Sequence, residues 1–361
     1  MGNENIHIKK NVDESGKWYD KKISGLSREG MKILSELEDK SKSMIESRNI
    51  DKRQLRYLKQ LKKMRLNTPN FYKKSIPPKV FYNGVKGFFL ENDIPHEIIS
   101  RVVPALVTYI ETGHMRPILF VGDKGCGKTT ATRLIAEEIL QLPSCLIKIP
   151  QTSGGHGMTG DNGSYQSADA GYIAKARIDN DSLLVVYTFD EIDKPPAQNA
   201  HSNAVNELLS ITDESCSDIY DSYLEVPLVG LEHCPMFFTA NDLKQVNPVL
   251  ADRCTVIKYP NPDVTASKSI GKKYAEKILQ NNIYKMIEFD NCLLDNAIEK
   301  LIENNVTSLR KHQQLVEAVI NNALNVAMEQ PGEEQVSVTK AMFIKAMNDV
   351  MESEGSKKIG F

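Results

Sequence analysis

The sequence predicts an α/β fold in which a parallel sheet is flanked by helices, with a helical arm before it and a helical lid domain after it. Three observations predict this. Apolar runs alternate with amphipathic segments over residues 76–260, a glycine-rich stretch links one run to a helix, and the pattern turns helical from residue 261. We therefore expect three parts, which are residues 1–75, 76–260 and 261–361.

The N-terminal arm is strongly basic. Residues 1–75 hold 19 Lys and Arg against 10 Asp and Glu, a net charge of +9, whereas the remainder carries −11. Helices are expected over residues 27–47 and 51–64, and the second has leucines every three residues among basic side chains. Such a helix can bind the phosphates of a nucleic acid, dock on the acidic body of the protein or stay solvated.

The sheet is expected from short apolar runs that lie between helical segments. Runs that are apolar throughout are typical of strands buried on both faces of a parallel sheet. The expected strands are residues 117–121, 145–149, 183–189, 236–239 and 255–259. The lid domain is expected to contain helices over residues 265–279, 290–304, 308–328 and 339–351, with a short strand at residues 335–338.

A phosphate-binding motif follows the first of these strands. Residues 122–129, GDKGCGKT, fit the pattern GxxxxGK[ST] between the strand PILFV and a helix that begins KTTATRL. Glycine backbone N–H groups can wrap phosphates there, aided by the helix N-terminus. Lys128 is expected to reach the β- and γ-phosphates of ATP, and Thr129 to ligate Mg²⁺. The expected nucleotide-binding residues are Gly122, Gly125, Cys126, Gly127, Lys128, Thr129, Thr130 and Asp190.

Acidic and amide side chains follow two later strands. In LLVVYTFDEID, Asp190 is expected to hold Mg²⁺ through water, and Glu191 to polarise the attacking water as a general base. Asp193 is expected to cap or pair structurally. In MFFTAND, the amide of Asn241 can position the water against the γ-phosphate.

Two arginines complete the set of candidate catalytic residues. Arg253, in NPVLADRC, is expected to act on the nucleotide of a neighbouring subunit as an arginine finger in trans. Arg310, in VTSLRKHQQL, is expected to fold back onto the γ-phosphate. The alternative for each is a surface charge, which is the usual place of arginine.

These motifs together resemble an AAA+ ATPase, and more narrowly the ATPase module of Lon proteases. The resemblance covers residues 117–338, and YDSYLEVPL is its most specific part because it lies outside the generic nucleotide motifs. It implies a homo-hexameric ring that acts on a protein substrate. The motifs occur in the order of that family: the phosphate motif, TSGG, FDEIDK, AVNELLSITD, YDSYLEVPL, FFTAND, LADRCTVI and SLR.

The resemblance also offers a role for Tyr165 in the polar stretch TGDNGSYQSADAG. In Lon-like ATPases an aromatic residue at this position projects into the central channel and grips an extended polypeptide, and a ring on a polar loop provides sequence-tolerant contact. Gln166 replaces the apolar residue that usually follows. The alternative is that Tyr165 packs against its own domain.

The composition argues against a zinc-binding, disulfide-bonded or membrane protein. The six cysteines have no CxxC spacing and the histidines no HxxxH spacing, which argues against a zinc site and fits a reducing cytoplasm. No apolar run is long enough to cross a bilayer, so we expect a cytoplasmic protein without membrane contact.

The sequence therefore predicts an ATP-hydrolysing motor that remodels, unfolds or threads a partner protein. Only 51 residues follow Arg310, which leaves no room for the family's peptidase domain, so we expect a motor without its own protease. The alternatives are a nucleic-acid-associated ATPase and a nucleotide-gated assembly switch in a multi-protein system, of which phage defence is one example.

Overall fold

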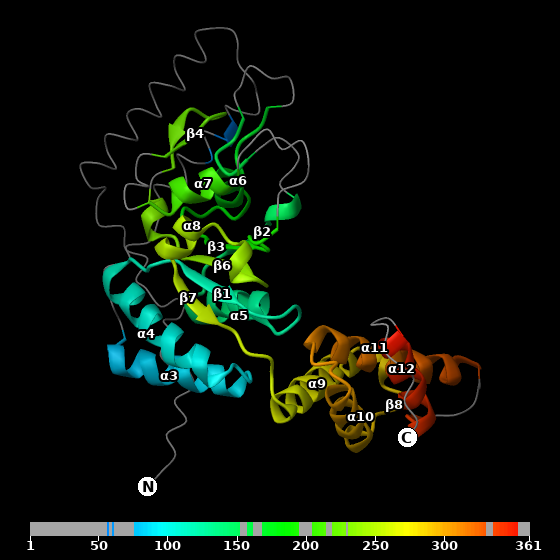
Figure 1. The fold of residues 1–361 in the computed structure, drawn as a ribbon. Coiled ribbons are helices and arrows are strands. Elements are labelled where there is room, and N and C mark those ends of the chain that lie inside the picture. Colours follow the sequence, from blue (N-terminus) through cyan, green and yellow to red (C-terminus); the bar gives the residue numbers. More distant parts are fainter. Residues whose placement is uncertain are drawn as a thin grey trace. The chain divides into compact units, whose positions relative to one another are not determined.

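A computed structural model describes residues 56, 57, 60, 76–151, 157–161, 168–194, 204–213, 219–228, 230–329 and 335–352 (Figure 1). These residues form two compact units. The first unit falls within Met1–Phe88, Glu97–Val121 and Lys128–Lys258. The second falls within Phe89–His96, Gly122–Gly127 and Tyr259–Phe361. The two helices expected in the N-terminal arm lie outside the described residues, apart from residues 56, 57 and 60.

The first unit is built on a parallel sheet with the strand order β2-β3-β6-β1-β7. Its strands are β1 (Ile118–Val121), β2 (Ser144–Lys148), β3 (Val186–Asp190), β6 (Met236–Ala240) and β7 (Thr255–Lys258). Because all five run the same way, the carboxyl ends of β3, β6 and β1 lie beside one another at one edge of the sheet. The residues that follow these strands are therefore brought together.

Helices accompany this sheet, and those that lie between its strands in the sequence provide the crossovers that parallel strands require (Figure 1). They are α5 (Lys128–Leu134), α6 (Tyr172–Asp179), α7 (Ala204–Ile211) and α8 (Pro248–Arg253), whereas α3 (Pro78–Glu91) and α4 (His96–Thr112) precede β1. Short helical turns lie at η3 (Ile149–Gln151), η5 (Leu231–His233) and η6 (Leu243–Gln245), and β4 (Tyr220–Asp221) pairs antiparallel with β5 (Val226–Pro227).

The centre of the sheet is held by aromatic side chains. Phe120 stacks on Phe237 with ring centroids 6.1 Å apart, and Phe189 stacks on Phe238 at 5.0 Å. All four are fully buried. Burial of one such side chain contributes on the order of 2 kcal/mol, so these strands form a rigid base for the residues at their ends.

The expected strands are all present, with two local differences in this unit. β3 begins at Val186 rather than at residue 183, because the Ser182 hydroxyl donates to the Leu184 carbonyl and accepts from its N–H, which holds a turn there. The helix expected after the phosphate motif is α-helical only to Leu134. It continues as the π-helical segment η2 (Ile135–Leu140) and ends at Gln141 with φ 52°.

The second unit is a helical bundle with its own apolar core. Its helices are α9 (Val264–Leu279), α10 (Asn291–Glu303), α11 (Leu309–Glu329) and α12 (Lys340–Glu352), with the turn η7 (Asn282–Tyr284). The strands β8 (Ile287–Glu288) and β9 (Val336–Ser337) pair in parallel. Asp263 and Asp290 cap α9 and α10 by accepting backbone N–H bonds, as N-cap aspartates do.

Candidate functional site

The phosphate loop, Gly122–Gly127, connects β1 to α5. Gly125 and Gly127 have φ values of +77° and +111°, which glycine adopts without strain. A Cβ atom on Gly122 would lie 2.2 Å from the Tyr259 carbonyl oxygen, so the loop packs too closely there for any side chain. Such a tight glycine turn before a helix is typical of loops that bind phosphate through backbone N–H groups.

The phosphate loop belongs to the second unit and is held there by residues at the start of α11. The Leu309 N–H, at the start of α11, donates to the Gly125 carbonyl at 3.0 Å. A Cβ on Gly125 would lie 2.2 Å from the Ser308 hydroxyl and 3.6 Å from the Arg310 Cβ. Arg310 is exposed, and its side chain leaves the backbone next to Gly125. Burial raises the pKa of Tyr259, which therefore stays a neutral phenol behind Gly127.

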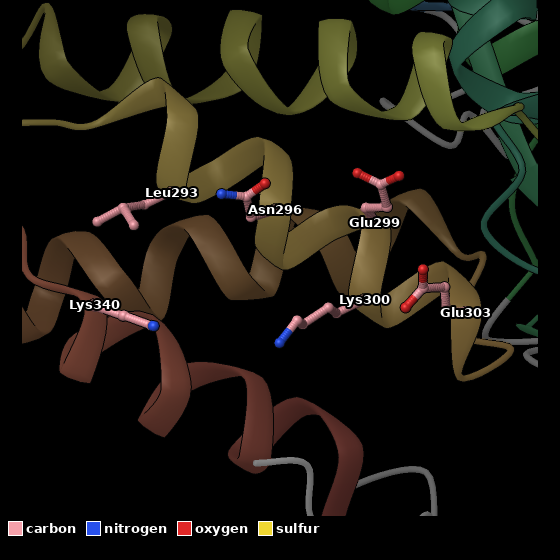
Figure 2. A pocket seen from close by; sticks show the side chains of 6 residues that line it. All are labelled: Leu293, Asn296, Glu299, Lys300, Glu303 and Lys340. Atoms are coloured by element: carbon pink, nitrogen blue, oxygen red, sulfur yellow. The ribbon is translucent and has the colours of Figure 1, made fainter. Parts of the chain in front are cut away.

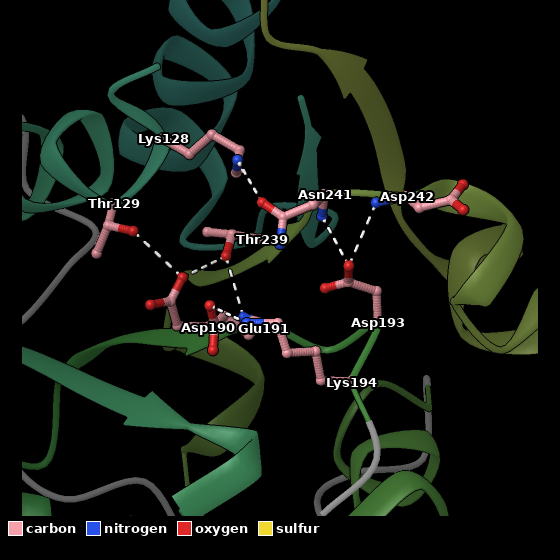
Figure 3. A network of polar contacts seen from close by, with 9 residues as sticks. All are labelled: Lys128, Thr129, Asp190, Glu191, Asp193, Lys194, Thr239, Asn241 and Asp242. Carbon is pink, nitrogen blue, oxygen red and sulfur yellow. Dashed lines mark hydrogen bonds and ion pairs between the residues drawn. The ribbon is translucent and has the colours of Figure 1, made fainter. Parts of the chain in front are cut away.

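The first turn of α5 carries three of the expected nucleotide-binding residues. Lys128 is 7% exposed and its Nζ donates to the Asn241 Oδ1 at 3.3 Å (Figure 3). Thr129 is half-buried and Thr130 is exposed, whereas Cys126 just before them is buried. A lysine–amide contact thus joins the start of α5 to the residue after β6, although these positions are far apart in the sequence.

Asp190, at the end of β3, is the centre of a hydroxyl–carboxylate cluster. Its Oδ1 accepts from the Thr129 Oγ1 at 3.2 Å and also from the Thr239 Oγ1 (Figure 3). A hydroxyl and a carboxylate oxygen facing each other are hard ligands of the kind that Mg²⁺ prefers. The described residues contain no group of three or more His, Cys, Asp or Glu that could hold an ion alone. An ion here would need phosphate and water as its further ligands.

Glu191 follows Asp190 in an unusual backbone conformation. Its φ is +60°, in the left-handed region that non-glycine residues seldom adopt. Its N–H donates to the Thr239 Oγ1 at 3.2 Å, and its carboxylate pairs with the Lys194 ammonium (Figure 3). The turn directs the two neighbouring acidic side chains differently, with Asp190 towards Thr129 and Glu191 towards Lys194.

Arg253 lies at the end of α8 and contacts the end of α7. Its Nη2 is 2.9 Å from the Asp213 Oδ2, and its Nη1 donates to the Leu209 carbonyl. The guanidinium is about one-third exposed. Arg253 is therefore tied to its own chain and separate from the cluster around Asp190.

The structure does not describe Tyr165 and Gln166, nor residues 152–156, which contain TSGG. It does describe the two ends of the polar stretch that holds Tyr165. The Asp161 N–H donates to the Asp169 carbonyl at 3.2 Å, and a Cβ on Gly171 would lie 2.3 Å from the Met158 carbonyl oxygen. Residues 157–161 and 168–171 therefore lie in direct contact, and together they form what we call the neck.

Asp221 of β4 closes the neck from the side. Its Oδ2 accepts from the Gly171 N–H at 2.8 Å, and its Oδ1 accepts from the N–H groups of Tyr223 and Leu224. Asp221 is fully buried, and this burial raises the pKa of its carboxyl to about 6, against the lowering effect of the three backbone N–H groups and Lys175. This aspartate belongs to the YDSYLEVPL motif, and the sequence alone did not indicate a structural role for it.

The second unit also contains a surface hollow of about 370 Å³ between α10 and α12 (Figure 2). Its lining contains two acidic, two basic and two uncharged residues, and none of them is an expected site residue. The lining residues are Leu293, Asn296, Glu299, Lys300, Glu303 and Lys340.

Comparison with known proteins assigns the domain. Residues 118–261 match the family model described as "ATPase family associated with various cellular activities (AAA)". This part of the chain is an AAA domain. It carries the phosphate loop, Asp190 and Asn241, and it binds nucleotide as a P-loop ATPase domain.

Within the family, the AAA domain is similar to that of Lon proteases. A Lon protease homolog of Acanthamoeba polyphaga mimivirus is 25% identical over 56% of this chain and 20% of its own length. The Lon protease of Amoebophilus asiaticus is 28% identical over 59% of this chain and 26% of its own length. The chain thus spans about a quarter or less of these relatives.

A solved structure gives the same fold. The S. cerevisiae Hsp104–ADP complex matches with a TM-score of 0.55 and 14% identity, over 73% of this chain and 50% of that chain. The predicted α/β fold with a helical C-terminal region is therefore confirmed. In the described part of the chain, no helix is long and apolar enough to cross a membrane.

Sequence patterns did not single out several residues of this site. Thr239 shares Asp190 with Thr129, yet it is an ordinary β-branched residue in an apolar strand. Tyr259 and Ser308 support the phosphate loop from distant positions. Lys194 pairs with Glu191 within the turn after β3, which is not helical, so helical spacing does not mark this pair in the sequence.

Proposed function

We propose that this protein is an ATP-hydrolysing motor that remodels, unfolds or threads a protein partner through the pore of a ring. The observation that carries the proposal is the cluster at the carboxyl edge of the sheet, in which Lys128 and Thr129 of α5 meet Asn241 and Asp190. The Lon relatives support the choice of a protein substrate.

Within this proposal the residues of the cluster have separate tasks. Lys128 binds the β- and γ-phosphates, and Asn241, which already contacts the lysine, orients the attacking water. Glu191 accepts the proton of that water. Thr129 and Asp190 hold Mg²⁺, which neutralises phosphate charge when bound.

The arginines extend the site beyond this cluster. Arg310 starts next to the phosphate loop and reaches the γ-phosphate from there. Arg253 acts on the nucleotide of the next subunit in a homo-hexamer, and its guanidinium has to leave Asp213 to do so. Tyr165 and Gln166 contact the polypeptide, and the neck fixes both ends of the loop that carries them.

The experiment is the steady-state ATPase rate of the full chain with no addition, with unfolded casein, and with single- or double-stranded DNA. We expect casein to raise the rate severalfold, Tyr165→Ala to abolish that increase, and Tyr165→Phe to keep it because the ring is retained. Glu191→Gln provides the rate without the catalytic carboxylate.

Two results would contradict the proposal. Stimulation by casein that survives in Tyr165→Ala would remove the loop from substrate contact. Stimulation by DNA that is insensitive to Tyr165 and lost at high salt would assign the function to the basic arm, because phosphate binding by Lys and Arg is strongly salt-dependent. The nucleic-acid alternative would then replace the protein-remodelling function.

A further inference from the structure

Asp193 is a buried carboxylate that the roles assigned above do not use. It follows β3 by three residues and is 7% exposed. Its Oδ2 accepts from the N–H groups of Asn241 and Asp242, at 3.1 and 3.3 Å (Figure 3). Its Oδ1 has no hydrogen-bond partner within the described part of the chain. A carboxylate is costly to bury, so its contacts call for an explanation.

These contacts join the residues after β3 to the residues after β6. The two strands pair in parallel up to Phe189 and Phe238, and the Ile192 N–H then donates to the Thr239 carbonyl at 3.0 Å. β6 ends at Ala240, and the N–H groups of the next two residues, Asn241 and Asp242, both donate to the Asp193 carboxylate. The Asp193 side chain thus continues the link between the two segments where the strand pairing stops.

The backbone that Asp193 holds is the one that presents Asn241. The side chain of Asn241 leaves this backbone towards Lys128, whose Nζ lies 3.3 Å from its Oδ1 (Figure 3). Glu191 lies two residues before Asp193, in the segment after β3, whereas Asn241 lies in the segment after β6. The turn that contains Glu191 and Asp193 is closed by the Lys194 N–H, which donates to the Glu191 carbonyl at 3.0 Å.

We propose that Asp193 is a positioning residue for ATP hydrolysis, which acts through Asn241. It fixes the amide that orients the water relative to the segment that carries the general base, so that the two groups keep their spacing. This inference rests on the proposed function. The carboxylate itself does not touch the nucleotide, and its contribution is to keep Asn241 within the sub-ångström tolerance of a reacting geometry.

The experiment measures kcat and the dissociation constant for ATP in the full chain, at a temperature well below the melting temperature of every variant. We expect Asp193→Ala to lower kcat about tenfold or more, because a small displacement of a positioned group is sufficient for such a loss. The ATP dissociation constant should change less than about threefold, since the phosphate loop is untouched. Asp193→Asn keeps an acceptor oxygen and should recover most of kcat.

The neighbouring Asp242 offers a matched control. Its carboxylate caps η6 by accepting the Lys244 N–H at 2.9 Å and does not contact Asn241 or Asp193 through its side chain (Figure 3). Asp242→Ala removes a carboxylate and a cap one residue away, so it lowers the melting temperature without breaking the link. Its kcat should stay within about twofold of wild type.

The double variant separates positioning from general stability. If Asp193 acts through Asn241, then Asp193→Ala causes little further loss of kcat in an Asn241→Ala background. Additive losses, a kcat for Asp193→Ala equal to that for Asp242→Ala, or a fall in ATP affinity that matches the fall in kcat would each overturn the inference. A wild-type chain without ATP turnover would overturn the proposed function and this inference together, which distinguishes the two failures.

Discussion

Asp193 and Asp221 are both buried carboxylates in the first unit, and both accept hydrogen bonds from backbone N–H groups, but their surroundings differ. Asp221 at the neck uses both oxygens, for three N–H donors in all. Asp193, near the cluster around Asp190, uses one oxygen for two donors, and the other oxygen has no partner in the part of the chain that the structure describes. Burial alone does not reveal which carboxylate is structural, whereas the number of acceptor sites in use does.

The largest effect should come from Asp221→Ala. Three buried N–H groups lose their acceptor at once, and each unsatisfied group costs about 1–3 kcal/mol, so we expect the free energy of unfolding of the first unit to fall by about 4 kcal/mol. Urea unfolding followed by circular dichroism measures this. Asp193→Ala leaves only two N–H donors without an acceptor, so it should lower the free energy of unfolding by less. An equal loss in the two variants would contradict the difference drawn between Asp193 and Asp221.

An intermediate effect should come from crowding the neck. In Gly171→Ala the new Cβ would lie 2.3 Å from the Met158 carbonyl oxygen, and overpacking of this kind costs about 1–3 kcal/mol. Gly87→Ala in α3 is the control, because a Cβ there meets nothing within 4 Å and alanine favours a helix by about 0.5–1 kcal/mol. Thermal unfolding should show opposite shifts, and equal shifts would mean that the neck can relax.

The smallest effect should be a pH dependence that belongs to Asp221 alone. Its pKa in the folded chain is about 6, above the ordinary 3.8, so the folded state binds the proton more tightly than the unfolded state. The stability from this group is present at low pH and is lost as pH rises through 6. Linkage then gives a gain of about 1 kcal/mol in the free energy of unfolding between pH 7 and pH 5.

The measurement is the difference between wild type and Asp221→Asn, taken from urea unfolding at both pH values. Subtraction removes the other titrating groups, and the asparagine variant should lack the gain. A difference that is the same at pH 5 and pH 7 would show that the neck carboxylate titrates in its ordinary range. The lowering of its pKa by the three N–H donors would then outweigh the raising by burial.

The meeting of Asp190 and Asn241 at the carboxyl edge of the sheet could be predicted from sequence, because each stands at the end of an apolar run. Those runs form parallel strands, and parallel strands bring their carboxyl ends together. The contact of Lys128 with Asn241 follows the same logic across 113 positions. The division of the chain at residues 75 and 260, and the roles of the site residues, stay predictions.

The neck could not be predicted in this way. Asp221 lies fifty positions from Gly171, in a short hairpin, and no periodicity relates the two. The acceptor role of Thr239 is equally hidden, since threonine in a strand is ordinary. Asp193 was expected to cap or pair structurally, but its partners depend on β3 and β6 being neighbours, and sheet order is not written in any local pattern.

The backbone of Glu191 has a consequence for engineering this chain. A side chain at φ +60° carries strain of about 1 kcal/mol or more that glycine would not have. Selection for heat tolerance alone would therefore favour glycine at position 191, and it would remove the carboxylate that we propose as the base. A mutant library built to stabilise the protein should keep this codon fixed, because Glu191→Gly would be selected for stability and would inactivate the proposed ATPase.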